Sequence, residues 1–187
     1  MPGNAKTARK QRSHERILQS AARLVRERGI AGTSVADVMR GARLTVGGFY
    51  AHFPSKEALI DEAIARTGRQ LREGLFRQAG GRAAAIIGRY LSPEHRDARG
   101  TGCPLPAVAG EIATTAPAHG EALAAEIDAF ARELRAALPE RRLSADGALA
   151  IVALLAGGLG LSRAVRGSAL SDRLLRACRH AALTLTT

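Results

Sequence analysis

The sequence predicts an all-α fold, and three features of its 187 residues support this prediction. Apolar residues recur at intervals of three and four along most of the chain, which is the spacing of one face of an α-helix. No stretch alternates apolar and polar residues over the length of a β-strand. Glycine, proline and serine interrupt the apolar segments where helices would begin or end. We therefore expect helices joined by short turns.

The first third of the chain predicts three short helices followed by a long one. Helices are expected over residues 14–28, from Thr33 or Ser34 to Ala42, over residues 45–53, and from Ser55 onward. Only Arg43 and Leu44 separate the second helix from the third. This is the length of the tight turn in a helix-turn-helix motif, in which the later helix projects its N-terminus.

The remainder of the chain also has a helical pattern. Helices are expected over residues 56–78, 82–91, 104–114, 117–138, 145–165 and 171–185, with Pro139 ending the fourth of these. Residues 94–102 are charged and are expected to form a surface loop.

Positive charge is concentrated at the front of the chain. The whole chain has a net charge of +11, and residues 1–60 contain 11 basic and 4 acidic side chains, which leaves +7 there. Such an excess favours a polyanionic partner. A genome that prefers arginine is the alternative explanation, because lysine occurs only at Lys6, Lys10 and Lys56. The uneven distribution favours the first explanation.

The composition also predicts a cytoplasmic protein without a membrane span. The longest apolar stretch, residues 148–161, is interrupted by three glycines, and the N-terminus lacks the apolar core of a secretory signal. The two cysteines, Cys103 and Cys178, cannot make a disulfide framework, so both are expected to be reduced thiols.

The third predicted helix begins with unusually small side chains. Thr45 and Val46 precede two adjacent glycines, Gly47 and Gly48. Inside a helix each glycine costs about 1 kcal/mol relative to alanine, so a purely structural helix rarely retains both. Close approach of another molecule explains them, and close packing within the protein is the alternative.

Aromatic residues give this helix two faces. Phe49 and Phe53 are four residues apart and are expected to face the core, so Tyr50 and His52 point outward.

The segment from Thr33 to Leu59 resembles the DNA-binding signature of the tetracycline-repressor (TetR) family of transcriptional regulators. Its third helix ends in Tyr-Ala-His-Phe and is followed by Pro-Ser-Lys-Glu-Ala-Leu, where the family has Tyr-x-x-Phe, a short turn and Ser/Asn-Lys-x-x-Leu. The resemblance covers roughly residues 10–65, and the rest matches only in helical layout. It implies an N-terminal three-helix helix-turn-helix domain followed by a helical ligand-binding and dimerisation domain.

The resemblance also implies roles for individual residues. Tyr50 and His52 would contact DNA phosphates, Lys56 would contact another, and Thr33 would cap the second helix over the DNA backbone. A solvated surface histidine is the alternative interpretation of His52.

Base reading is expected from Thr45, Val46 and Ala51, whose methyl groups suit thymine, and from Arg43, which suits guanine. Gly47 and Gly48 complete the predicted DNA-binding set. Few strong donors are present, so DNA shape is expected to carry much of the discrimination. In the family a glycine usually stands where this chain has Arg43, so a left-handed backbone there would strain the arginine.

Three parts of the chain are therefore expected: a basic flexible arm over residues 1–12, a helix-turn-helix DNA-binding domain over residues 13–57, and a helical ligand-sensing and dimerisation domain over residues 58–187. The arm would follow the minor groove or the phosphates, and a solubilising tail is the alternative.

The last two helices are the expected homodimer interface, because the helix over residues 145–165 is apolar nearly all round. The interface candidates are Leu149, Val152, Leu155, Gly158, Leu159, Leu174, Cys178 and Ala181. The core of a single protomer is the alternative.

A ligand pocket is expected between the middle helices. The candidates are Phe76, Ile87, Tyr90, Cys103, Val108, Ile112, Phe130, Leu134 and Leu155, and plain core packing is the alternative for each. The scarcity of aromatic residues favours an aliphatic or small ligand. Cys103 precedes a predicted helix start, where a thiolate would be stabilised and could react with electrophiles; a small buried residue is the alternative.

These patterns predict a ligand-responsive regulator, a repressor released from a palindromic operator in double-stranded DNA by a small molecule or an electrophile. An activator of the same fold is the first alternative. A thiol-dependent enzyme using Cys103 and His119 is the second, although no phosphate loop, nucleophile elbow or metalloprotease spacing is present. A protein that compacts DNA without sequence preference would need only the charge. The five histidines are scattered, so neither a catalytic site, a metal nor a cofactor is expected.

Overall fold

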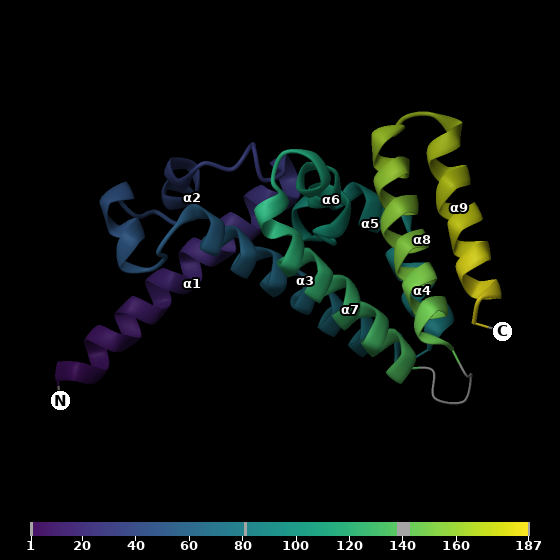
Figure 1. Ribbon diagram of the computed structural model, residues 1–187, viewed down its shortest axis with the longest axis horizontal. Coiled ribbons are helices and arrows are strands. Elements are labelled where there is room, and N and C mark those ends of the chain that lie inside the picture. The colour runs from purple at the N-terminus through teal and green to yellow at the C-terminus, as the bar shows by residue number, and fades with distance from the viewer. Residues whose placement is uncertain (1, 81, 138–142, 187) are drawn as a thin grey trace.

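The computed structural model describes residues 2–80, 82–137 and 143–186, and these residues form an all-α fold (Figure 1). The α-helices are α1 (Pro2–Arg28), α2 (Val35–Gly41), α3 (Lys56–Ala79), α4 (Ala83–Tyr90), α5 (Pro93–Asp97), α6 (Leu105–Thr114), α7 (Gly120–Ala136), α8 (Ala145–Ala164) and α9 (Ala169–Thr184). Short 3-10 helices are η1 (Val46–Ala51), η2 (Arg99–Thr101) and η3 (Pro117–His119). The described residues contain no strand, so the predicted fold class is confirmed.

The N-terminal helices enclose a small core of their own. Buried side chains of α1, α2, η1 and the first turns of α3 form one cluster, which includes Ile17, Val38, Phe49 and Leu59. Ser55 begins α3 by accepting a hydrogen bond from the Ala58 amide at 3.1 Å. These contacts fix η1 at the surface of the N-terminal end, as Figure 1 shows at the left of the molecule.

A second, larger core lies in the C-terminal half. It joins the later turns of α3 to α4, α7, α8 and α9, with Tyr90, Phe130, Leu134 and Ile151 among its buried side chains. The hairpin of α8 and α9 stands across the end of the long α3–α7 pair in Figure 1. Among the described helices, α8 alone is long and apolar enough to span a membrane by length and composition, a test that core helices of soluble proteins also pass.

Helix α1 differs from its prediction. The segment expected to be a flexible arm is helical from Pro2, so the helix expected to begin at His14 starts twelve residues earlier. Figure 1 shows its first turns projecting beyond the other helices. Alanine, lysine, arginine and glutamine between Ala5 and Arg12 are strong helix formers, and nothing after Gly3 interrupts them. Gly29 follows α1 with φ at +75°, so the helix ends at Arg28, where the sequence predicted its end.

The segment expected to be a surface loop also contains helical turns, because α5 and η2 lie within residues 93–101. Ser92 caps α5 by accepting from the His95 amide at 3.1 Å, and Pro93 follows it at the first helical position. The predicted helix end at Leu138 and Pro139 lies outside the described residues.

Three hydrogen-bonded contacts hold the end of α1 and the turn after it, and those of Glu111 and Arg26 join the two halves. The Glu111 carboxylate on α6 accepts from the backbone amides of Ile30 and Ala31, at 3.0 and 2.7 Å. The Lys56 ammonium donates to the Ile30 carbonyl at 3.4 Å. Arg26 Nε on α1 donates to the Gly100 carbonyl at 2.6 Å. The turn after α1 is therefore held from the C-terminal half.

Candidate nucleic-acid interface and ligand cavity

The helix-turn-helix is present, but its second helix is a single 3-10 segment, η1, instead of the predicted α-helix. Ser34 caps α2 by accepting from the Asp37 amide at 3.0 Å. Thr45 precedes η1 but makes no side-chain capping bond. With only six residues, two of them glycine, η1 has little intrinsic helix stability, so the packing beneath it determines its shape.

The turn between α2 and η1 contains a strained residue. Arg43 has φ at +55° and is the one non-glycine residue with positive φ in the described part of the chain. The left-handed backbone anticipated at this position is therefore real, and the arginine bears a steric cost that a glycine would not. The exposed side chain of Arg43 lies beside the start of η1.

The aromatic side chains of η1 divide as predicted. Phe49 and Phe53 are buried, with ring centroids 5.9 Å apart. Tyr50 is 77% exposed and Val46 is 52% exposed. The buried pair anchors η1, so its outer face carries exposed apolar and hydroxyl groups.

The adjacent glycines open the outer face of η1. A Cβ atom added at Gly47 would meet nothing within 4 Å, and one added at Gly48 would meet only the methyl end of Met39, at 3.9 Å. Packing within the protein therefore does not require either glycine. The space at Gly47 is open, whereas at Gly48 an added Cβ atom would approach the buried Met39.

His52 and Lys56 flank this face. His52 is half-buried, and its Nδ1 is buried without a hydrogen-bond partner among the described residues. Burial lowers the pKa of His52, and electrostatic repulsion from the nearby His14 and Lys10 lowers it further. Lys56 begins α3, next to its capped N-terminus.

Thr33 has a different position from the one expected. Its side chain is buried, and its hydroxyl donates to the Gly29 carbonyl at 2.7 Å. Ser34 is the cap of α2, because the chain enters the helix one residue later. Thr33 therefore stabilises the turn after α1 and is not available to a phosphate.

The residues predicted to line a ligand pocket lie in the packed core. Ile87, Tyr90, Cys103, Phe130, Leu134 and Leu155 belong to the C-terminal core, and Phe76 packs against it. Val108 and Ile112 belong to a separate cluster with Val25 and Ile60. The structure does not bring these nine side chains together around a hollow.

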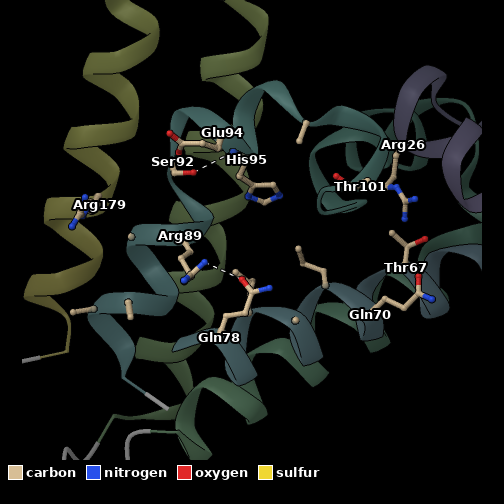
Figure 2. Close-up of a pocket in the computed structure, with 17 residues that line it drawn as sticks. Arg26, Thr67, Gln70, Gln78, Arg89, Ser92, Glu94, His95, Thr101 and Arg179 are labelled. Atoms are coloured by element: carbon tan, nitrogen blue, oxygen red, sulfur yellow. Dashed lines mark hydrogen bonds between the residues drawn. The ribbon is translucent and has the colours of Figure 1, made fainter. Parts of the chain in front are cut away.

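A cavity of about 880 Å³ lies instead on the other side of α3 and α4 (Figure 2). Its volume is within the usual range for sites that bind small molecules. The lining residues are Arg26, Thr67, Gln70, Leu71, Gly74, Leu75, Gln78, Ala84, Ala85, Gly88, Arg89, Ser92, Glu94, His95, Ala98, Thr101 and Arg179. Sequence reasoning missed this set, because most of its members are polar or small.

Cys103 is buried beside Tyr90, and burial raises the pKa of its thiol to about 11. The thiol is therefore protonated at neutral pH, which opposes reaction with electrophiles and favours the alternative of a small buried residue. His119 Nδ1 donates to the Asp61 carboxylate at 2.7 Å. Cys103 and His119 thus have separate partners and do not form a nucleophile–base pair.

His95 connects two segments in the wall of the cavity. Its Nδ1 donates to the Tyr90 carbonyl at 2.7 Å, and its Nε2 accepts from the Cys103 amide at 3.1 Å. The second bond requires an unprotonated Nε2, so the ring is neutral. Burial lowers the pKa of His95 to about 4, which agrees with this assignment.

The predicted dimer residues divide into two groups. Val152, Leu155, Gly158 and Leu159 face the interior of the chain, whereas Leu149 and Ala181 are exposed and Leu174 and Cys178 are half-buried. The first group packs inside the protomer, since a Cβ atom at Gly158 would lie 2.8 Å from Cys178. The outer face of α8 and α9 carries leucines that are 41–58% exposed, namely Leu149, Leu161, Leu170 and Leu185.

Residues 17–63 match the family model described as bacterial regulatory proteins, tetR family. The chain is 42% identical over 48 residues to the transcriptional repressor KstR2 of Mycobacterium tuberculosis, a match that covers 26% of this chain and 24% of that protein. It is 34% identical over 104 residues to an uncharacterized HTH-type transcriptional regulator of the same organism, covering 52% of each. The matches thus span between a quarter and about half of the length of these curated relatives.

Solved structures resemble the whole chain. A TetR transcriptional regulator from Chloroflexus aurantiacus superposes with a TM-score of 0.76 at 26% identity, covering 95% of both chains. A TetR-family regulator from Cytophaga hutchinsonii gives a TM-score of 0.77 at 22% identity, covering 96% of this chain and 97% of that one. The similarity in fold therefore extends beyond the N-terminal match into the C-terminal half.

Proposed function

Because this chain belongs to the TetR family of bacterial transcriptional regulators, we propose that it is a repressor that binds a palindromic operator as a homodimer and is released by a small molecule. Regulators of this family bind DNA and act as dimers, and the curated relatives include repressors. The family and fold are those of DNA-binding regulators, not of enzymes.

The open face of η1 carries this proposal. Gly47 leaves space that nothing in the protein fills, between the exposed side chains of Val46 and Tyr50, and Gly48 next to it adds no side chain. A backbone that is bare on one side can approach the floor of the major groove, where methyl groups and hydrogen-bonding atoms distinguish the bases. Thr45, Val46 and Ala51 would contact base edges.

The rim of the same face would hold the DNA backbone. Tyr50, Arg43 and Lys56 present a hydroxyl and two cations around η1, and His52 offers a ring nitrogen. Such groups donate to phosphate oxygens and fix the position of the protein on the duplex. In this proposal residues 13–57 form the DNA-binding domain and residues 58–187 form the sensing and dimerisation domain. The site of action is the cytoplasm.

The outer face of α8 and α9 is the proposed homodimer interface. Two such hairpins would form a four-helix bundle, which would cover the four exposed leucines. A two-fold dimer places two recognition segments about 34–36 Å apart, one turn of duplex DNA. This spacing explains why a palindrome is the expected operator.

The cavity beside α3 is the proposed effector site. It is lined by residues of α1, α3, α4, α5, η2 and α9, so a ligand there would contact both the DNA-binding end and the dimerisation hairpin. Filling it would shift α3 relative to α1 and alter the spacing of the two recognition segments. The protonated, buried Cys103 favours a non-covalent effector over an electrophile.

The test begins with an operator selected from random duplex DNA by the purified protein. Gly47→Leu should abolish operator binding without loss of thermal stability, because the new side chain has free space in the protein and none in the groove. The matched control is Gly110→Leu on α6, where an added Cβ also meets nothing within 4 Å. Unchanged operator affinity in Gly47→Leu would contradict the proposed interface.

Transcription from the selected operator distinguishes a repressor from an activator. A reporter placed behind this operator should be transcribed less when the protein is present. Increased transcription would support the activator of the same fold instead.

A further inference from the structure

The effector cavity has an apolar wall. Leu71 and Leu75 of α3, Ala84 and Ala85 of α4, and Ala98 supply it. This wall suits the hydrocarbon part of a ligand.

Cations outnumber acids among the polar side chains of the same cavity. Arg26, Arg89 and Arg179 come from three different helices, whereas Glu94 is the one carboxylate in the lining. His95 is neutral, because both ring nitrogens are engaged as a donor and an acceptor. Figure 2 shows Arg26 and Arg179 on opposite sides of the cavity, with Arg89 near Gln78 between them.

None of the three arginines has an ion-pair partner among the described residues. Arg26 is half-buried and donates through Nε to the neutral Gly100 carbonyl, and its burial lowers its pKa. Arg89 donates to the amide oxygen of Gln78 at 2.9 Å.

Arg179 lies close against α4. Its guanidinium carbon is 3.4 Å from the point that a Cβ atom at Gly88 would occupy. The absence of a side chain at Gly88 therefore leaves room for a cation from α9 at the wall of the cavity.

From this charge balance we infer that the effector is an organic anion, a molecule with an apolar body and at least one carboxylate, sulfonate or phosphate group. The inference rests on the proposed function, in which this cavity is the effector site. The half-buried guanidinium of Arg26 has no ion pair, so it gains most from a ligand oxyanion, which accepts charge-assisted and often bidentate hydrogen bonds. Arg89 and Arg179 are exposed and add positive charge around the same cavity. Neutral ligands would leave these donors without a strong acceptor.

The same charge links the ligand to the DNA-binding end. Arg26 belongs to α1, which carries the core of the DNA-binding domain, and it donates to the segment between α5 and α6. An anion held by Arg26 would therefore bind α1 to the cavity directly. Arg26 would therefore both favour an anionic ligand and couple its binding to α1.

Two probes with the same ring system test the inference. The anionic probe is 8-anilinonaphthalene-1-sulfonate, and the neutral probe is N-phenyl-1-naphthylamine, which lacks the sulfonate. Fluorescence titration of the full-length dimer should show saturable binding of the anionic probe at least about tenfold tighter than of the neutral one, as expected for a charge-assisted hydrogen bond.

Four variants, of which Arg77→Gln is the control, assign the preference to the cavity. Arg26→Gln and Arg89→Gln should each reduce the preference for the sulfonate, whereas Arg77→Gln, an exposed arginine of α3 outside the cavity, should preserve it. Gly74→Met should remove binding of both probes, because Gly74 lines the cavity and has no atom within 4 Å of an added Cβ.

The outcomes separate the two proposals. Equal affinity for the two probes, or no saturable binding of the sulfonate, overturns the inference of an organic anion. If both probes bind equally and Gly74→Met removes both, the effector cavity itself stands. If Gly74→Met leaves binding of both probes unchanged, the cavity is not the ligand site and the proposed effector site is wrong.

Discussion

The end of the molecule that carries η1, which is the proposed DNA-facing end, and the end formed by α8 and α9 both expose apolar side chains. The neighbours of these side chains differ. Around η1, Val46 and Tyr50 stand beside bare glycine backbone and the cations Arg43 and Lys56. On α8 the exposed Leu149 and Leu161 lie among alanines and glycines, whereas on α9 the exposed Leu170 lies close to Asp172 and Arg173. The first surface suits a hydrated polyanion with methyl groups in its groove, and the second suits a copy of itself.

The glycines of the two ends also differ in whether the protein itself fills the space beside them. Gly47 faces open space on the DNA-facing end, and Gly157 does so on the outer face of α8. Gly158, one residue later, lies against Cys178 and allows α8 and α9 to pack closely. An exposed glycine therefore indicates a partner only when the structure shows that its own protein does not need the space.

The largest expected effect comes from adding the same charge at each end. Leu161→Glu should convert the dimer to a monomer and weaken operator binding at least about 100-fold, because a buried carboxylate without a partner costs several kcal/mol. Val46→Glu should weaken operator binding similarly, through repulsion by phosphates, while the dimer persists. Light scattering gives the assembly state and fluorescence anisotropy gives the affinity. If the Leu161→Glu variant remained a dimer, the proposed homodimer interface on α8 and α9 would be wrong.

The second effect concerns the C-terminal half alone. The pKa of His95 is about 4 in the folded protein, against 6.5 for an unperturbed histidine, so the unfolded chain binds more protons between these values. The contribution of a neutral His95 to stability is therefore complete above pH 6.5 and is lost as the pH falls toward 4, by about 3 kcal/mol in total.

The variant His95→Gln isolates this contribution. Its deficit in unfolding free energy relative to the natural protein should be largest at pH 7 and should shrink at pH 4.5, as denaturant titrations at each pH would show. The exposed His180 supplies the control, since His180→Gln should give no such change. A deficit that is the same at both pH values would show that His95 is not held neutral.

A third, smaller effect should appear only at the DNA-facing end. Lys56→Ala should lower the slope of log affinity against log salt concentration by about 0.9, the value for one phosphate contact. Tyr50→Phe should cost about 1 kcal/mol of operator binding, as expected for one lost hydrogen bond. Arg77→Ala, distant on α3, should change neither quantity. Salt dependence measured by anisotropy decides whether Lys56 contacts a phosphate.

The smallest effect is expected at the turn of the helix-turn-helix. Arg43→Gly should raise the free energy of unfolding by about 1 kcal/mol, because glycine adopts the left-handed backbone without steric cost. Operator binding should weaken at the same time if the guanidinium contacts DNA. Thermal and denaturant unfolding measure the first quantity, and a loss of stability in Arg43→Gly would show that the side chain contributes more than its strain costs.

The DNA-facing end was largely predictable because local signals determine it. Caps such as Ser55, the spacing of Phe49 and Phe53, and the left-handed backbone at Arg43 depend on neighbouring residues. The assignment of Thr33 failed because Thr33 and Ser34 can both cap a helix, and only the path of the turn decides between them. The 3-10 form of η1 was missed for a similar reason, since residue spacing does not distinguish it from one α-helical turn.

The C-terminal half was predictable as helices but not as a site. The helix expected over residues 145–165 is α8, Ala145–Ala164, because apolar periodicity reports burial directly. The same reasoning selected apolar residues for the pocket, and burial placed them in the core. Gln70, Gly74 and Gln78 lie four residues apart on one face of α3, but Gln70 and Gln78 are exposed, and polar residues on an exposed helix face do not by themselves indicate a cavity.

The Glu111 carboxylate makes the two halves mechanically dependent. It accepts hydrogen bonds from two consecutive backbone amides after α1. If α6 moved, either the turn after α1 would move with it or these two amides would lose their acceptor. This turn leads directly into α2, and α2 packs against η1 in the N-terminal core. A displacement of α6 would therefore also move α2 and η1, because the side chain of Glu111 connects them.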